Sequence, residues 1–65
     1  MTTPILYKVV EVHPIFGRTV IQVCGSFNDA RQYTDKAADL AEAPCIFEIE
    51  KHVADAPVAI VYRTW

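Results

Sequence analysis

The chain has 65 residues, a formal net charge of −2 at pH 7 and a hydrophobic fraction of 52%. This length allows one domain, residues 1–65, that buries only about 60% of its unfolded surface, so we expect marginal stability without outside help. The six cations are scattered along the chain, which disfavours a nucleic-acid partner, and no apolar run reaches the ~18 residues that span a bilayer.

The first predicted element is a strand over residues 5–13, because the segment ILYKVVEVH is rich in β-branched and aromatic residues. Its alternation changes where Val9 and Val10 follow each other. This change predicts either a sheet covered on both faces or a bulge at this point.

A turn follows the first strand, because Pro14 and Gly17 are turn residues and residues 19–25 resume the strand pattern. The two segments therefore predict a β-hairpin. Its tip carries Ile15 and Phe16, which either fold back on the domain or project as an apolar anchor.

The only helical period lies in residues 26–43, where polar and apolar positions fall on opposite sides. Ser26 is the expected N-cap, and Pro44 is expected to end the helix. The inner side is mostly alanine, so Phe27, Tyr33 and Leu40 are expected to supply most of its apolar area. The outer side carries an acidic strip, which could be merely solvated or could meet a basic partner: Asp35, Asp39 and Glu42.

A second hairpin is predicted from a strand at 45–53, a turn at 54–57 and an apolar strand at 58–65. Alternation places Phe47 and Ile49 toward the helix. The order of elements is then β-β-α-β-β. It predicts an α+β fold with a four-stranded, mainly antiparallel sheet in the order 2-1-3-4 and one helix packed on one face.

One helix cannot cover all the apolar residues of four strands, so we expect an apolar patch on the far face that serves as a binding surface. The residues assigned to the helix side are Ile21, Val23, Phe47, Ile49, Val58 and Ile60. Those left on the far face are Val20, Cys24, Ile46, Val61 and Trp65.

Catalytic and metal chemistry find little support in the sequence. The histidines and cysteines have none of the short paired spacings of a zinc site, and the two cysteines are either free thiols or one disulfide. The only candidate set of a nucleophile, an orienting acid and a histidine is Cys45, Glu50 and His52. Alternation, however, puts Cys45 on the opposite face from the other two. Glu48 and Glu50 share a face, which is more typical of a solvated edge than of an acid-base pair.

A short hairpin, a helix opened by SFNDA and a second hairpin resemble tiny phage-encoded inhibitors of the anti-CRISPR kind. The resemblance covers nearly the whole chain through its length, element order and mild acidity. It implies a protein that binds a host defence complex by occlusion or charge mimicry, without catalysis. It assigns a role to no residue.

The sequence therefore predicts a non-enzymatic protein-binding module, without cofactor or metal, in the cytoplasm, which is that of the host cell if the protein is phage-encoded. The alternatives are a structural homo-oligomer, with a homodimer as its simplest form, and a nucleic-acid-binding regulator that uses Lys8, Arg18, Lys51 and Arg63. The expected partner-binding residues are Ile15, Phe16, Asp35, Asp39, Glu42, Ile46, Val61 and Trp65.

Overall fold

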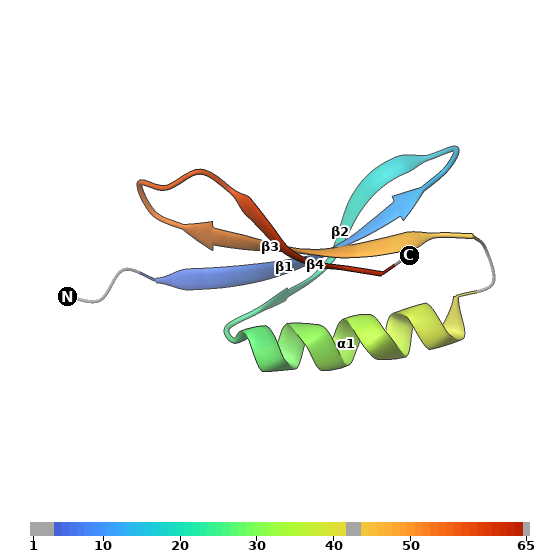
Figure 1. Cartoon of the computed structure of the whole chain (residues 1–65), viewed down its shortest axis with the longest axis horizontal. Coiled ribbons are helices and arrows are strands. Elements are labelled where there is room, and N and C mark those ends of the chain that lie inside the picture. Colours follow the sequence, from blue (N-terminus) through green and yellow to red (C-terminus); the bar gives the residue numbers. More distant parts are fainter. Residues whose placement is uncertain (1–3, 42–43, 65) are drawn as a thin grey trace.

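The computed structural model describes residues 4–41 and 44–64. These residues form, in chain order, β1 (Ile5–His13), β2 (Gly17–Cys24), α1 (Phe27–Leu40), β3 (Ile46–Val53) and β4 (Ala59–Arg63). The strands make one antiparallel sheet in the order β2-β1-β3-β4, and α1 lies on one of its faces (Figure 1). The predicted α+β fold and strand order are confirmed, with β1 and β3 central.

Helix α1 begins where the sequence places its cap. Ser26 is extended, and its hydroxyl accepts a hydrogen bond from the Asp29 backbone N–H at 3.2 Å. The end was predicted too late, because the last helical residue is Leu40 and Ala41 is already extended. Asp39 lies in the last turn, which has no basic residue. Its negative charge interacts unfavourably with the negative end of the helix dipole, which weakens the helix before Pro44.

The core lies between α1 and the two central strands. Val9 of β1 and Ile49 of β3 meet Ala30 of α1, and all three are completely buried. Thr34 lies one turn after Ala30, is also buried, and donates its hydroxyl to the Ala30 carbonyl at 2.7 Å. Short side chains at Ala30 and Thr34 let the helix approach the sheet closely, as the alanine-rich stripe predicts.

The larger residues of the helix stripe behave differently from the prediction. Phe27 packs on the core and makes edge-to-face contacts with Tyr7 and Tyr62, at centroid distances of 5.9 and 6.5 Å. Tyr33 and Leu40 are exposed, however, with Leu40 at 70%. The helix rests on its small residues, so these two side chains lie at its flank rather than beneath it.

Two bulges explain why several face assignments were wrong. The β1–β2 register shifts opposite Val9 and Val10, which makes Ile21 an extra residue, and the β3–β4 register shifts at Val61 in the same way. Each extra residue puts the residues before it and after it out of simple alternation with each other. As a result Cys24 packs on the helix-side core, whereas Val23 pairs with Lys8 on the far face.

In β4 the same break in alternation places Ile60 on the far face, where it pairs with Glu50. Val58 precedes the strand and is half exposed, so it does not belong to the core either. The predicted irregularity near Val9 is confirmed, although the extra residue belongs to β2.

Candidate functional site

The sheet face opposite α1 is the open face. Glu48 and Glu50 flank the helix-facing Ile49, so both glutamates point to the open face. Val10 is the direct partner of Glu48 on β1 and therefore lies on the same face. Although no helix covers this face, Val10 is 2% exposed and Glu48 is 3% exposed. The centre of the open face is thus buried by its own side chains.

An ion-pair cluster of Arg18, Glu48, Glu50 and Arg63 provides this cover. Arg18 reaches from edge strand β2 across β1 and pairs with both glutamates of β3, at 2.6 Å for Glu50. Arg63 comes from the other edge, β4, and its guanidinium lies 2.6 Å from the Glu48 carboxylate. Two cations thus meet two anions over the central strands. The expectation that the two glutamates form a solvated edge is wrong, because β3 is a central strand.

His52 lies beside the ion-pair cluster on β3, and its Nε2 is 2.9 Å from the Glu50 carboxylate. The hydrogen bond from His52, and after it the bond from Arg18, hold the pKa of Glu50 below its ordinary value, against the opposing effect of burial. The carboxylate form of Glu50 is therefore the form that stabilises the fold.

We expect acidification to remove this contribution. Because the folded state lowers the pKa of Glu50, the stabilisation is complete above the ordinary glutamate pKa and is lost as the pH falls through the folded value. Urea unfolding measured stepwise from about pH 7 to about pH 3 should show a steeper loss of stability in the wild type than in Glu50→Gln. Identical slopes in the two proteins would contradict the assignment.

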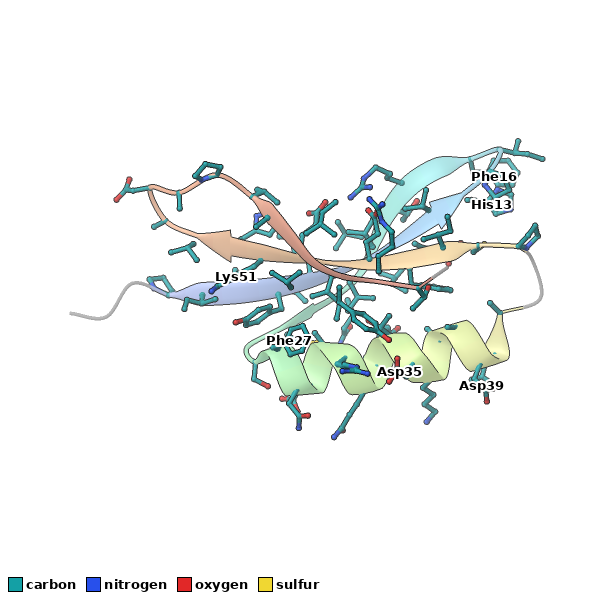
Figure 2. All side chains as sticks on the ribbon, viewed as in Figure 1. His13, Phe16, Phe27, Asp35, Asp39 and Lys51 are labelled. Carbon is teal, nitrogen blue, oxygen red and sulfur yellow. The ribbon has the colours of Figure 1, made fainter. Side chains whose placement is uncertain are left out.

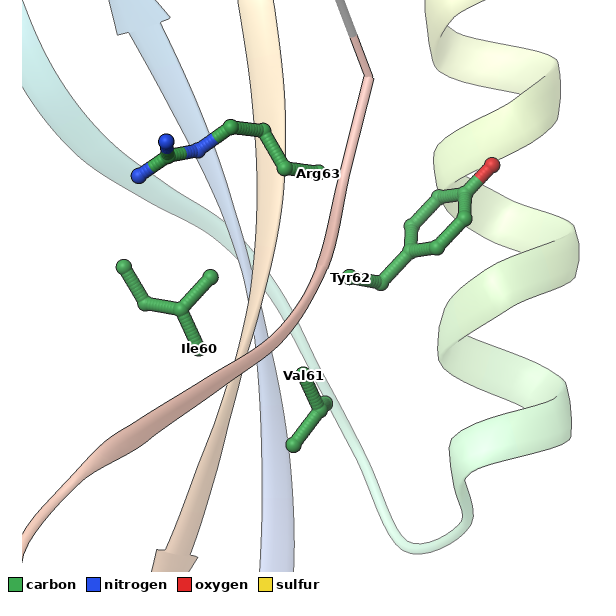
Figure 3. A pocket seen from close by; sticks show the side chains of 4 residues that line it. All are labelled: Ile60, Val61, Tyr62 and Arg63. Atoms are coloured by element: carbon green, nitrogen blue, oxygen red, sulfur yellow. The ribbon is translucent and has the colours of Figure 1, made fainter.

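Apolar side chains surround the ion-pair cluster. Val20 of β2 and Ile60 of β4 lie on the open face at its two edges and are 49% and 46% exposed. In Figure 3, Ile60 and Arg63 lie on one side of β4, while Tyr62 points toward α1. A shallow hollow of about 430 Å³ follows this strand and is lined by Ile60, Val61, Tyr62 and Arg63. The open face therefore combines ordered arginines with exposed apolar contacts.

The tip of the first hairpin projects from the domain. Ile15 and Phe16 are 80% and 82% exposed, so the tip does not fold back on the domain, and its role as an apolar anchor stays a prediction. The backbone N–H groups of Ile15 and Phe16 both donate to His13 Nδ1, at 3.0 and 3.2 Å. The Phe16 ring packs on the His13 ring with centroids 4.7 Å apart (Figure 2), and Gly17 closes the turn at φ 80°. His13 therefore orders the tip.

We expect His13→Ala to loosen the tip without unfolding the domain. The variant removes the acceptor of two amide hydrogens, so amide exchange at Ile15 and Phe16 should accelerate, with a stability loss of only about 1 kcal/mol. Exchange followed by NMR measures this directly. His13→Asn is the matched control, because its side-chain oxygen can accept the same bonds. Unchanged exchange in His13→Ala would show that the histidine does not order the tip.

The remaining predicted partner-binding residues do not gather in one place. Ile46 lies half-buried on the open face as predicted, but Val61, the bulge residue, points to the same side of β4 as Tyr62 (Figure 3). Glu42 and Trp65 fall outside the described residues.

Within the acidic strip, Asp35 accepts a hydrogen bond from the Tyr62 hydroxyl at 2.9 Å and lies 3.7 Å from Arg31. Arg31 also lies 4.8 Å from the centre of the Tyr62 ring. Asp35 therefore helps to fix β4 to the helix. Asp39 is exposed on α1 (Figure 2).

Neither thiol is activated. Cys24 and Cys45 are free; burial raises the pKa of both, and Asp29 and Glu11 respectively add to the effect. Cys45 contacts Glu11 at 3.8 Å, whereas His52 lies seven residues along an extended segment, roughly 20 Å away. The trio of Cys45, Glu50 and His52 is not brought together. Among residues 4–41 and 44–64, no group of His, Cys, Asp or Glu is placed to hold a metal ion.

The four cations proposed for nucleic-acid binding are divided between the two faces of the sheet, with three on the open face and one on the helix side. Arg18 and Arg63 are ion-paired in the cluster. Lys8 lies opposite Glu50 in the strand register and so on the open face, whereas Lys51 lies opposite Tyr7 on the helix side. Phosphate binding needs cations gathered on one side. Lys8, Arg18 and Arg63 share the open face, but both arginines are already paired with glutamates, so this geometry does not favour a nucleic-acid site.

The fold and site together define a small α+β domain with one helix-covered face and one open, ion-paired face. No family model, curated protein or solved structure matches the chain. In the part of the chain that the structure describes, no helix is long and apolar enough to cross a membrane.

Proposed function

We propose that the protein is a non-catalytic module that binds another protein on the open face of the sheet. The observation that carries the proposal is the convergence of Arg18 and Arg63 on the buried Glu48, with exposed apolar side chains at both edges. Arginines and apolar side chains are enriched at the centres of protein interfaces, and side chains that are already ordered lose little entropy on binding. The cluster thus presents a preorganised surface.

The charge of this surface points to a partner of mixed polarity. The two arginines and two glutamates of the ion-pair cluster balance each other, so long-range attraction contributes little to association. The exposed edge of the Arg18 guanidinium can donate to backbone carbonyls or carboxylates of a partner. Val20 and Ile60 then supply apolar contact at the two sides.

A phage-encoded inhibitor of a host defence complex is the narrower form of this proposal, and it would act by occluding the surface it binds. The proposed location is the cytoplasm, because the free thiols of Cys24 and Cys45 fit a reducing compartment.

Affinity capture with paired lysine variants tests the proposal. Val20→Lys and Ile60→Lys place a cation at the two edges of the open face, while Gln32→Lys places the same cation on the exposed helix side. The wild type and Gln32→Lys should retain the same stoichiometric partner from native host lysate. Both open-face variants should lose at least about tenfold in its affinity. A partner retained equally by all four proteins would place binding elsewhere.

A further inference from the structure

Strand β4 is attached to the domain more weakly than the other three strands. It has five residues, whereas the others have eight or nine. The structure describes all five residues of β4, and none of them is buried. Strand β2, at the other edge of the sheet, packs Ile21 and Cys24 against the core, whereas from β4 it is Tyr62 that packs there. Apolar burial therefore holds β4 less firmly than β2.

Polar contacts at the end of β4 supply much of its attachment. The Tyr62 hydroxyl donates to the Asp35 carboxylate of α1 at 2.9 Å, and the Arg31 guanidinium lies 4.8 Å from the centre of the Tyr62 ring. Arg63 pairs with Glu48 at 2.6 Å. The side chains of Asp35, Arg31 and Arg63 are each more than one third exposed. Water can therefore replace these contacts when β4 moves away.

The rest of the domain keeps its core when β4 is removed. The completely buried residues Val9, Ile49 and Ala30 belong to β1, β3 and α1. Glu48 keeps its ion pair with Arg18, which comes from the opposite edge of the sheet. Three strands that pack a hydrophobic face against a helix are enough for independent stability. The remaining β1, β2, β3 and α1 meet this condition.

We propose that β4 is a strap that opens by itself while β1, β2, β3 and α1 stay folded. Opening breaks the contacts of Tyr62 with Asp35 and of Arg63 with Glu48, and it exposes the edge of β3. It also removes Ile60 and Arg63 from the open face, so this face is complete only when the strap is closed. The opening itself does not rest on the proposed function.

Backbone amides of β3 can report the opening, because they point alternately to its two neighbouring strands. The Phe47 N–H donates to Thr64 Oγ1, just after β4, at 2.9 Å. The amide of Ile49, two residues further on, points the same way; we call these two the β4-side amides. The amides of Glu48 and Glu50 point to β1 and are the β1-side amides.

Amide exchange of the full chain, followed by NMR at low urea concentrations, tests the inference. The β4-side amides should have protection factors at least about tenfold lower than the β1-side amides. Their protection should also depend less on urea, because opening of one strand exposes less surface than global unfolding. Equal protection and equal urea dependence would mean that β4 opens only with the whole domain, which would overturn the inference.

Two variants separate opening of the strap from global unfolding. Tyr62→Phe removes a contact that only the closed state makes, so exchange should accelerate about threefold at both pairs of amides. Ser26→Ala removes the helix cap, which opening leaves intact. It should accelerate exchange about fivefold at the β1-side amides and leave the β4-side amides unchanged. Equal acceleration of all four amides by Ser26→Ala, or no acceleration by Tyr62→Phe, would contradict the proposal.

Discussion

Ile49→Ala should destabilise the domain by about 3–4 kcal/mol, which approaches the whole free energy of unfolding expected for a chain of this size. Ile49 is completely buried and contacts the other core residues, Val9 and Ala30, between the sheet and α1. No other side chain can fill the cavity, because the helix already rests on its alanine and threonine residues.

Urea unfolding followed by circular dichroism measures this loss of stability. If the alanine variant does not fold, Ile49→Val can be measured in its place, with an expected loss of about 1 kcal/mol. Ile60→Ala is the matched control, because Ile60 lies on the open face and is 46% exposed. It should cost less than about 1 kcal/mol. Equal losses at Ile49 and Ile60 would mean that the two faces do not differ in burial.

Glu48→Gln should destabilise the domain by about 2–3 kcal/mol, a fall in Tm of roughly 10–20 °C. The substitution keeps the shape of the side chain but removes the charge that Arg18 and Arg63 share. The cost stays below that of a fully buried pair, because both arginines are partly exposed and can be hydrated when their partner is lost.

Asp39→Asn provides the comparison for Glu48→Gln, since it makes the same kind of change on the exposed helix side. It should alter stability by no more than about 0.5 kcal/mol. Glu48→Gln should also reduce binding of a partner to the open face, because the arginines are no longer held in place. A Glu48→Gln protein as stable as the wild type would show that the ion-pair cluster does not organise this face.

The element order and strand order follow from the sequence because they depend on strong local signals. The 5–13 strand, the Ser26 cap and the turn residues are each visible within a few positions. Four strands that alternate in direction around one helix then leave few arrangements with antiparallel neighbours throughout. The order β2-β1-β3-β4 is one of these.

The faces of the edge strands could not be predicted, because a single extra residue reverses the alternation and leaves no local trace. Ile21 and Val61 are β-branched like the residues that precede them, Val20 and Ile60, so nothing in β2 or β4 identifies them as bulge residues. Only their pairing with the central strands does so. The misplacement of Val23, Cys24 and Ile60 follows from these two positions.

The ion-pair cluster was missed for a related reason. Glu48 alternates with apolar residues, which is typical of a solvated strand face, and its partner Arg18 lies 30 residues away in the chain. Its near-complete burial depends on arginines that arrive from both edges of the sheet. The hydrogen bonds that His13 accepts from Ile15 and Phe16 were not predicted either. A histidine before a proline turn does not by itself indicate this contact.

Site-specific photo-crosslinking in the native host tests the central claim, that the open face is the binding surface, most directly. A photoreactive residue would replace Val20 or Ile60 on the open face, or Gln32 on the exposed side of the helix. The proposal predicts that the two open-face positions crosslink to the same foreign protein and that position 32 does not. Crosslinks only from position 32, or different products from the two open-face positions, would contradict it.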